Sequence, residues 1–210
     1  MPAPNVEVPA TEVRVPSLTM MLAEAASATT DGPLAGFRMS EKDRYELKIA
    51  GLLHDCGKIT TPVHVVDKAT KLETIFDRIE LVSQRFEILK RDAEIDMLRA
   101  RCEALSKGDA AAVEAMELDF RSRIATLDDD RAFLRRMNVG GERMSPDDQW
   151  RVDRIAAYKV RNERGELVSF LTQDERENLN IPYGTLTPAE RKVINHHIEA
   201  TINMLEALPW

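Results

Sequence analysis

Apolar residues in the middle of the chain follow two seven-residue repeats. Between 73 and 106 they advance in alternating steps of four and three, and a similar series runs from 113 to 134. This is the spacing of helices that pack along a seam. Gly108 can end the first helix and Asp109 can cap the second, so the pattern predicts an antiparallel helical hairpin over about 73–137. The two seams are Ile75, Ile79, Val82, Phe86, Leu89 and Ala93, then Val113, Met116, Phe120, Ile124, Leu127 and Leu134.

Helices are also predicted before this hairpin. Apolar residues recur at helical spacing over 14–29. Ser40 opens a capping box for a second helix, and Gly57 is expected to end it. Residues 59–62 (ITTP) are predicted to be extended, because the residue before Pro62 is disfavoured in the helical region. We expect one apolar face of the second helix to be buried, formed by Tyr45, Ile49, Leu52 and Leu53.

The segment after the hairpin shows the same helical signals. Ser145 and Thr172 open further capping boxes. Residues 159–167 predict a turn with short extended flanks, and one final helix is expected from 187 to about 208. No repeat of the solenoid type is present. The whole chain is therefore predicted to be all-α.

Composition and charge narrow the function classes. The chain has 210 residues, of which 43% are hydrophobic, enough to form a core. Its net charge of -7 argues against a nucleic-acid polymer as partner but not against a phosphorylated small molecule, because metals can supply positive charge. Two cysteines without a paired framework suit a reducing cytoplasm. We expect no membrane segment and no secretory signal.

Candidate chemistry lies in the string LLHDCGKITTP at 52–62. It places His54 and Asp55 at the end of an apolar helix, with Lys58 just beyond the Gly57 stop. In the final helix, His197 falls on the apolar stripe, whereas His196 lies about 100° round the helix. The other members of that stripe are Ile194, Thr201, Leu205 and Leu208.

Two explanations of these polar residues are possible. A buried histidine needs a partner, since a polar group without one is costly to bury. A divalent metal would bind the imidazoles and the carboxylate, and Lys58 would then be placed to bind a phosphate. Alternatively, His54 bonds to Asp55 within the core and Lys58 is only solvated. Physical argument alone leaves these two explanations about equal.

A family resemblance favours the metal site. LLHDCGKITTP followed by VVDKATKL is similar to the HDxGK run of the HD-GYP branch, within the HD superfamily of metal-dependent phosphohydrolases. EVRVPSLTMMLAEAA resembles the first helix of that branch. LTPAERKVINHHIEATINMLEAL resembles its segment with the next ligand histidine. The match covers roughly 11–72 and 186–208, and its three pieces occur in family order.

The resemblance implies a role for each matching residue. His54, Asp55 and His197 correspond to metal ligands, and Asp55 is the expected bridge between ions. Lys58 corresponds to the lysine that contacts the scissile phosphate, so Lys58 and Asp55 are the catalytic candidates. The implied cofactor is a divalent transition metal, iron or manganese rather than zinc, with two or more ions in a complete domain.

The sequence also departs from the family pattern. Thr11 stands where the family has a ligand histidine. Glu7, four residues earlier, matches a position that some members use as an additional metal ligand. An HHExxDGxGYP motif and a final ligand aspartate are expected beyond Trp210. We therefore expect the chain to be part of a larger protein, fused to further domains, and whether this part alone is active is left open.

The implied function is hydrolysis of a cyclic dinucleotide, chiefly cyclic di-GMP, by a signalling phosphodiesterase. The alternatives are hydrolysis of another nucleotide or phosphate ester, or a non-catalytic helical module for signalling or dimerisation. A homodimer through the helical hairpin is a further expectation.

The domain organisation follows from these matches. Residues 1–12 are expected to be flexible. Residues 13–72 and 187–210 form an incomplete HD-type bundle, and 73–186 are an insertion that contains the hairpin.

Overall fold

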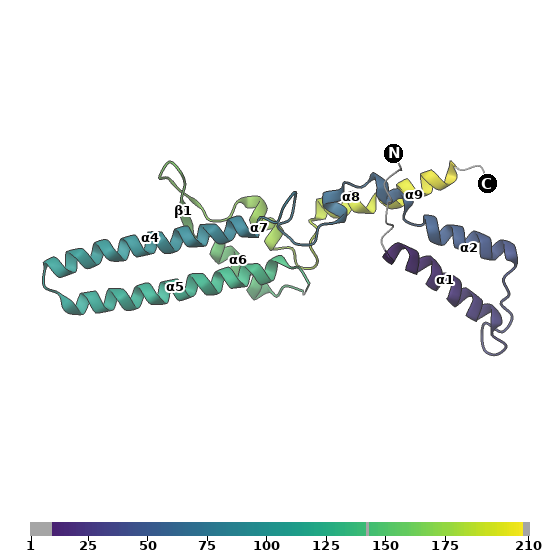
Figure 1. Cartoon of the computed structure of the whole chain (residues 1–210), viewed down its shortest axis with the longest axis horizontal. Helices are drawn as coiled ribbons and strands as arrows, with labels where there is room; N and C mark the ends of the chain where they lie inside the picture. Colours follow the sequence, from purple (N-terminus) through teal and green to yellow (C-terminus); the bar gives the residue numbers. More distant parts are fainter. Residues whose placement is uncertain (1–9, 142, 208–210) are drawn as a thin grey trace, which may run out of the picture. The chain divides into compact units, whose positions relative to one another are not determined.

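The computed structural model describes residues 10–141 and 143–207. These residues form two compact units, each described by itself (Figure 1). Residues 10–62 with 192–207 are called the split unit, and residues 63–191 the hairpin unit. Helices dominate both, and the described residues contain one sheet, of two strands, so the all-α prediction is confirmed. No helix among them is long and apolar enough to cross a membrane.

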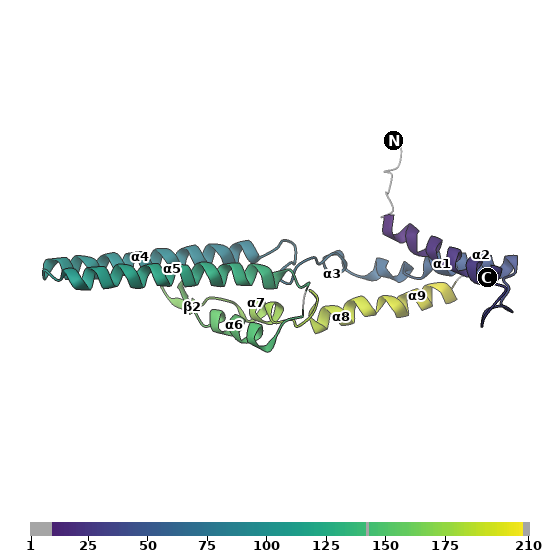
Figure 2. The ribbon, with the colours of Figure 1, turned by 90° about the horizontal axis from the view of Figure 1, so that it is seen from below.

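The predicted hairpin is present in the hairpin unit. Helices α4 (Ile79–Ser106) and α5 (Ala110–Asn138) run side by side in both views (Figures 1 and 2). Gly108 has a φ of +73°, which favours glycine, and the Asp109 side chain accepts a hydrogen bond from the Ala112 N–H as an N-cap. The turn between the helices therefore forms as the sequence indicates.

The start of the first hairpin helix was predicted too early. Helix α4 begins at Ile79 rather than near Glu73, and Ile75 is 96% exposed instead of lying in the seam. Polar side chains explain the difference. The Glu73 carboxylate accepts from the backbone N–H groups of Ala69 and Thr70. Further on, the Thr74 N–H donates to the Phe76 carbonyl and the Ile79 N–H donates to the Asp77 carboxylate, so local bonds replace helical ones up to Ile79.

The core of the hairpin unit lies where further elements pack on the base of the hairpin. Phe86 of α4 meets Phe170 edge to face, with ring centroids 4.6 Å apart. Val82, Leu134 and Ile155 are fully or almost fully buried beside them. The packing elements include α6 (Pro146–Ala156), β1 (Lys159–Arg161) and α7 (Gln173–Leu179). The same unit also contains α3 (Val63–Val66) and β2 (Leu167–Ser169).

Local signals in this unit are borne out. Ser145 and Thr172 each form the predicted capping box, with Pro146 at the first position of α6. The turn with extended flanks is the antiparallel pair β1–β2, in which Val160 lies opposite Val168. These features depend on neighbouring residues only, which is why sequence alone predicts them.

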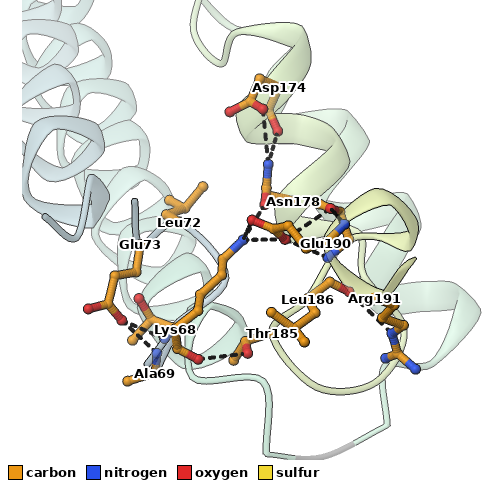
Figure 3. A network of polar contacts seen from close by, with 12 residues as sticks. Lys68, Ala69, Leu72, Glu73, Asp174, Asn178, Thr185, Leu186, Glu190 and Arg191 are labelled. Atoms are coloured by element: carbon orange, nitrogen blue, oxygen red, sulfur yellow. Dashed lines mark hydrogen bonds and ion pairs between the residues drawn. The ribbon is translucent and has the colours of Figure 1, made fainter. Parts of the chain in front are cut away.

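A buried lysine joins the two segments that flank the predicted insertion (Figure 3). The Lys68 ammonium donates to both carboxylate oxygens of Glu190 at 2.9 Å and to the Asn178 side-chain oxygen at 3.0 Å. The Thr185 hydroxyl donates to the Lys68 carbonyl at 2.9 Å. Burial acts to raise the pKa of the Glu190 carboxyl, but bonds from Lys68 and Thr187 hold it below its usual range.

Lys68→Met is expected to lower the free energy of unfolding by ~2–3 kcal/mol, because it leaves Glu190 half-buried without its cation. Chemical denaturation of the full chain, followed by circular dichroism, measures this change. Lys107→Met, at the exposed hairpin tip, is the matched control and should leave the midpoint unchanged. Equal midpoints for both variants would contradict a stabilising role for this ion pair.

The split unit consists of three helices and a short 3-10 helix. Pro16 in α1 (Ala10–Ala28) packs against Gly51 in α2 (Glu41–Leu53), where an added Cβ would lie 3.3 Å from the proline Cα. The 3-10 helix η1 (Cys56–Thr60) packs on α9 (His197–Glu206).

Three expectations for the split unit need correction. No residue of α2 is buried, and Tyr45 is 65% exposed, because α2 packs mainly along α1 at Gly51. Helix α1 begins at Ala10, four residues before the start predicted near Arg14. The single final helix is two, α8 (Pro188–Asn195) and α9, separated at His196. The Ser40 capping box forms as predicted.

Candidate active site

The candidate site begins where α2 ends. The last helical residue is Leu53, His54 is the C-cap and Asp55 follows it, before the 3-10 turn that carries Lys58. Gly57 was predicted as a helix stop, but its φ is not positive and it lies inside the 3-10 helix. Its role is therefore different from that of a C-terminal helix cap. Thr61 is extended, as expected for the residue before a proline, but Ile59 and Thr60, also predicted to be extended, lie in the 3-10 helix.

Gly57 allows the 3-10 turn to lie directly on α9. Its N–H donates to the buried Thr201 hydroxyl at 3.0 Å. A Cβ at this position would lie 2.5 Å from the Thr201 backbone nitrogen and still closer to the His197 carbonyl oxygen. Only glycine fits this contact without a backbone shift. Close packing here places the start of α9 beside His54, Asp55 and Lys58.

Three side chains converge on the Asp55 carboxylate. The Lys58 Nζ lies 2.6 Å from Oδ2, and the His54 Nε2 lies 3.2 Å from the same oxygen. The His197 Nε2 approaches Oδ1 at 3.6 Å from α9. His197 and Asp55 thus meet although they are more than 140 positions apart in sequence. The nearby Gly57–Thr201 hydrogen bond, with a sequence separation of 144, joins the same two segments.

Both imidazole rings present the same nitrogen to this carboxylate. The His54 Nδ1 lies 2.8 Å from the Gly51 carbonyl oxygen, and the His197 Nδ1 is bonded to the Ile194 carbonyl. A carbonyl only accepts, so each Nδ1 carries the proton. In the neutral rings each Nε2 then offers a lone pair toward Asp55. The Nε2 lone pairs and the Asp55 carboxylate oxygens are all acceptors. A cation or an added proton is therefore required between each ring and the carboxylate.

The charge of Asp55 is set by its neighbours. Partial burial acts to raise its pKa, but the Lys58 hydrogen bond and charge, with smaller contributions from His54 and His197, hold the pKa below its ordinary value. Asp55 is therefore an anion near neutral pH. Its only direct ammonium partner among the described residues is Lys58.

His196 and the N-terminal candidates lie apart from this cluster. The His196 side chain is 62% exposed and contacts Glu199 at 2.9 Å, whereas that of His197 is 17% exposed. The helical-face argument therefore separates the two histidines correctly. Glu7 lies outside the described residues. Thr11 is in α1, in a stretch whose side chains are not described.

Residues 13–132 match the family model of the HD domain. The chain belongs to the HD domain family. The match covers more than half of the chain and includes His54, Asp55 and Lys58, but not His197. No curated protein and no solved structure matched the chain.

HD domains are in general metal-dependent phosphohydrolases, so this family membership supports a hydrolase that uses divalent metal. The donor types in this HD domain fit such an ion, because two imidazole nitrogens and a carboxylate are common ligands of transition metals. Their arrangement fits less well. No group of three or more His, Cys, Asp or Glu side chains in the described part of the chain is arranged to hold a metal ion.

Sequence reasoning missed two residues of this site. Gly57 was interpreted as a helix stop and Thr201 as a position on the apolar stripe, yet together they hold the two halves of the cluster in contact. One sequence signal was available, because a small hydroxyl residue follows His197 by one helical turn on the same face.

Proposed function

We propose that the chain carries metal- and phosphate-binding residues of an HD-type phosphodiesterase that opens a cyclic dinucleotide, chiefly cyclic di-GMP, to a linear product. The main support is the convergence of the two Nε2 atoms of His54 and His197 on the Asp55 carboxylate. The HDxGK run at 54–58, which resembles the HD-GYP branch, supports the choice of substrate.

In this proposal His54, Asp55 and His197 hold the metal. A bound iron or manganese ion would supply Lewis acidity and an activated water for attack on phosphorus. The backbone carbonyls of Gly51 and Ile194 keep each Nδ1 protonated and thus each Nε2 free to bind. Asp55, with two oxygens facing different histidines, is suited to bridge.

Lys58 is the proposed phosphate-binding residue. Its ammonium neutralises Asp55 at 2.6 Å. When Asp55 holds the metal, Lys58 would turn its ammonium from this carboxylate to a non-bridging oxygen of the phosphodiester. Negative charge on these oxygens grows during displacement, so a fixed ammonium stabilises the transition state more than the bound substrate. The side chain is 41% exposed, which leaves room for this movement.

Lys58→Met is expected to lower kcat for cyclic di-GMP by about 100-fold, because one electrostatic stabiliser of the transition state is removed. Metal content should be unchanged, since Lys58 is not a ligand in this proposal. The measurement is turnover of cyclic di-GMP by chain loaded with manganese, with metal content by mass spectrometry. Lys48→Met, exposed on α2, is the matched control and should keep full activity.

Three outcomes would contradict the proposal. Loss of metal in Lys58→Met would show that this lysine builds the site rather than serving the substrate. Equal turnover of cyclic di-GMP and bis(p-nitrophenyl) phosphate would show that the site does not select a cyclic dinucleotide over a simple phosphodiester. Absence of turnover for every ester by metal-loaded chain would favour a non-catalytic module.

A further inference from the structure

Helix α4 carries a second apolar stripe, separate from the seam that faces α5. The buried seam follows Val82, Phe86, Leu89 and Ala93. The second stripe begins one residue before Leu89, about 100° round the helix. It consists of Ile88, Ile95, Leu98, Cys102 and Leu105, and is called the outer stripe.

The outer stripe is exposed and confined to one helix. Its apolar members Ile88, Ile95, Leu98 and Leu105 are between 41% and 58% exposed, and Cys102 is exposed as well. Within α5, all of which the structure describes, Leu118 is the one large apolar side chain exposed to this degree. Helix α5 thus has no comparable row of exposed apolar side chains, although it belongs to the same hairpin. A row of this kind on α4 indicates a surface that binds a partner.

The spacing of the outer stripe is that of a coiled-coil seam. Ile88, Ile95 and Cys102 recur every seven residues, and Leu98 and Leu105 each follow by three. A seven-residue repeat with this three–four alternation fits another helix rather than a small ligand or a flat surface. Arg91 occupies the remaining position of the repeat, three residues after Ile88.

We propose that the outer stripe binds the outer stripe of a second copy of this chain, with the two α4 helices antiparallel. Centring the pair between Ile95 and Leu98 places each of these residues opposite the other in the second copy. Ile88 then lies opposite Leu105, and Arg91 lies opposite Cys102. A two-fold axis relates the two copies, so each contact occurs twice.

Charges beside the stripe select this orientation. In the antiparallel pair Glu94 lies beside Arg101 of the second copy at one edge of the seam, and Asp92 lies beside Arg99 at the other edge. Each pair occurs twice by symmetry, so four flanking pairs of opposite charge attract. Arg101 already contacts Glu117 at 3.1 Å and has further N–H donors for a second carboxylate.

A parallel pair is disfavoured by the same residues. It would set Arg91 against Arg91 in the seam and Glu87 beside Asp92 at its edge, where only the Glu94–Arg99 pair would attract. Like charges in contact oppose association. The antiparallel overlap of 88–105 spans only about 27 Å of helix, so a concentration-dependent dimer is expected rather than a permanent one.

Analytical ultracentrifugation of the full chain, up to about 200 µM, tests the surface. Wild type should dimerise with rising concentration. Leu98→Glu should weaken association at least tenfold, because it places a charge in the centre of the seam. Leu118→Glu, on the outer face of α5, is the matched control and should dimerise like wild type. A wild type that stays monomeric, or a Leu98→Glu variant that associates as tightly, overturns the proposal.

Disulfide trapping tests the orientation. In a Cys56→Ser background, which leaves Cys102 as the one thiol, oxidation should give little covalent dimer. Adding Arg91→Cys should give a dimer linked between residues 91 and 102, identified by peptide mass mapping. Efficient linkage between the two Cys102 thiols instead would show a parallel pair and overturn the proposed register. Neither assay depends on metal or activity, so failure here is distinguishable from failure of the proposed function.

Discussion

His197→Ala is expected to lower the metal affinity of the chain by at least about 100-fold, whereas His196→Ala should leave it within twofold. The His197 Nε2 faces Asp55 Oδ1, and its Nδ1 is fixed by the Ile194 carbonyl. The His196 ring instead contacts the exposed Glu199 carboxylate. The measurement is metal content by mass spectrometry after equilibrium dialysis against manganese.

The neighbouring histidine makes this comparison informative. Both substitutions remove an imidazole at nearly the same place in the chain, so differences in expression or overall charge are matched. His197→Gln provides an intermediate, because an amide keeps polarity but binds transition metals poorly. Equal metal content in the His196 and His197 variants would contradict the assignment of a ligand to α9.

Features that depend on neighbours in sequence could be predicted. The capping boxes at Ser40, Ser145 and Thr172 each need two residues three positions apart, and all three form. The seam of the hairpin is similarly local, since burial of Phe86 and Leu89 follows from helical spacing once a partner helix is adjacent. The distinction between His196 and His197 depends on the same periodicity.

Features that depend on tertiary packing could not be predicted. The apolar spacing of Tyr45 and Leu52 indicates a buried face, but spacing does not say whether another element covers it, and both side chains are more than half exposed. The loop before α4 shows the converse, because the Asp77 carboxylate accepts from the Ile79 N–H and, from the end of α5, the Asn138 side chain. Competition of this kind is visible only when both partners are placed.

The site illustrates both cases. His54, Asp55 and Lys58 lie within five residues, so their proximity follows from the chain itself. The approach of His197 depends on a glycine whose role is steric. A glycine between a polar pair and a lysine resembles a helix stop, and only the contact with α9 distinguishes the two roles.

Gly57→Ala is therefore expected to disrupt the site more than a single methyl group suggests. Its Cβ would meet backbone atoms of His197 and Thr201, which cannot rotate away, so η1 must move off α9. Overpacking of this type costs ~1–3 kcal/mol, and a displacement near 1 Å at a catalytic cluster costs about 100-fold in rate. Metal affinity and turnover should fall together, which equilibrium dialysis and the cyclic di-GMP assay measure.

Two matched variants separate this steric effect from other causes. Gly36→Ala adds the same methyl group in the split unit where nothing lies within 4 Å, and it should behave like wild type. Thr201→Ala removes the hydroxyl that accepts from the Gly57 N–H and should cost only ~1 kcal/mol of stability. Because the clash of the new methyl group is with backbone, combining Thr201→Ala with Gly57→Ala should not restore metal binding. Recovery in that double variant would mean that a side chain, rather than the path of α9, sets the distance between His197 and Asp55.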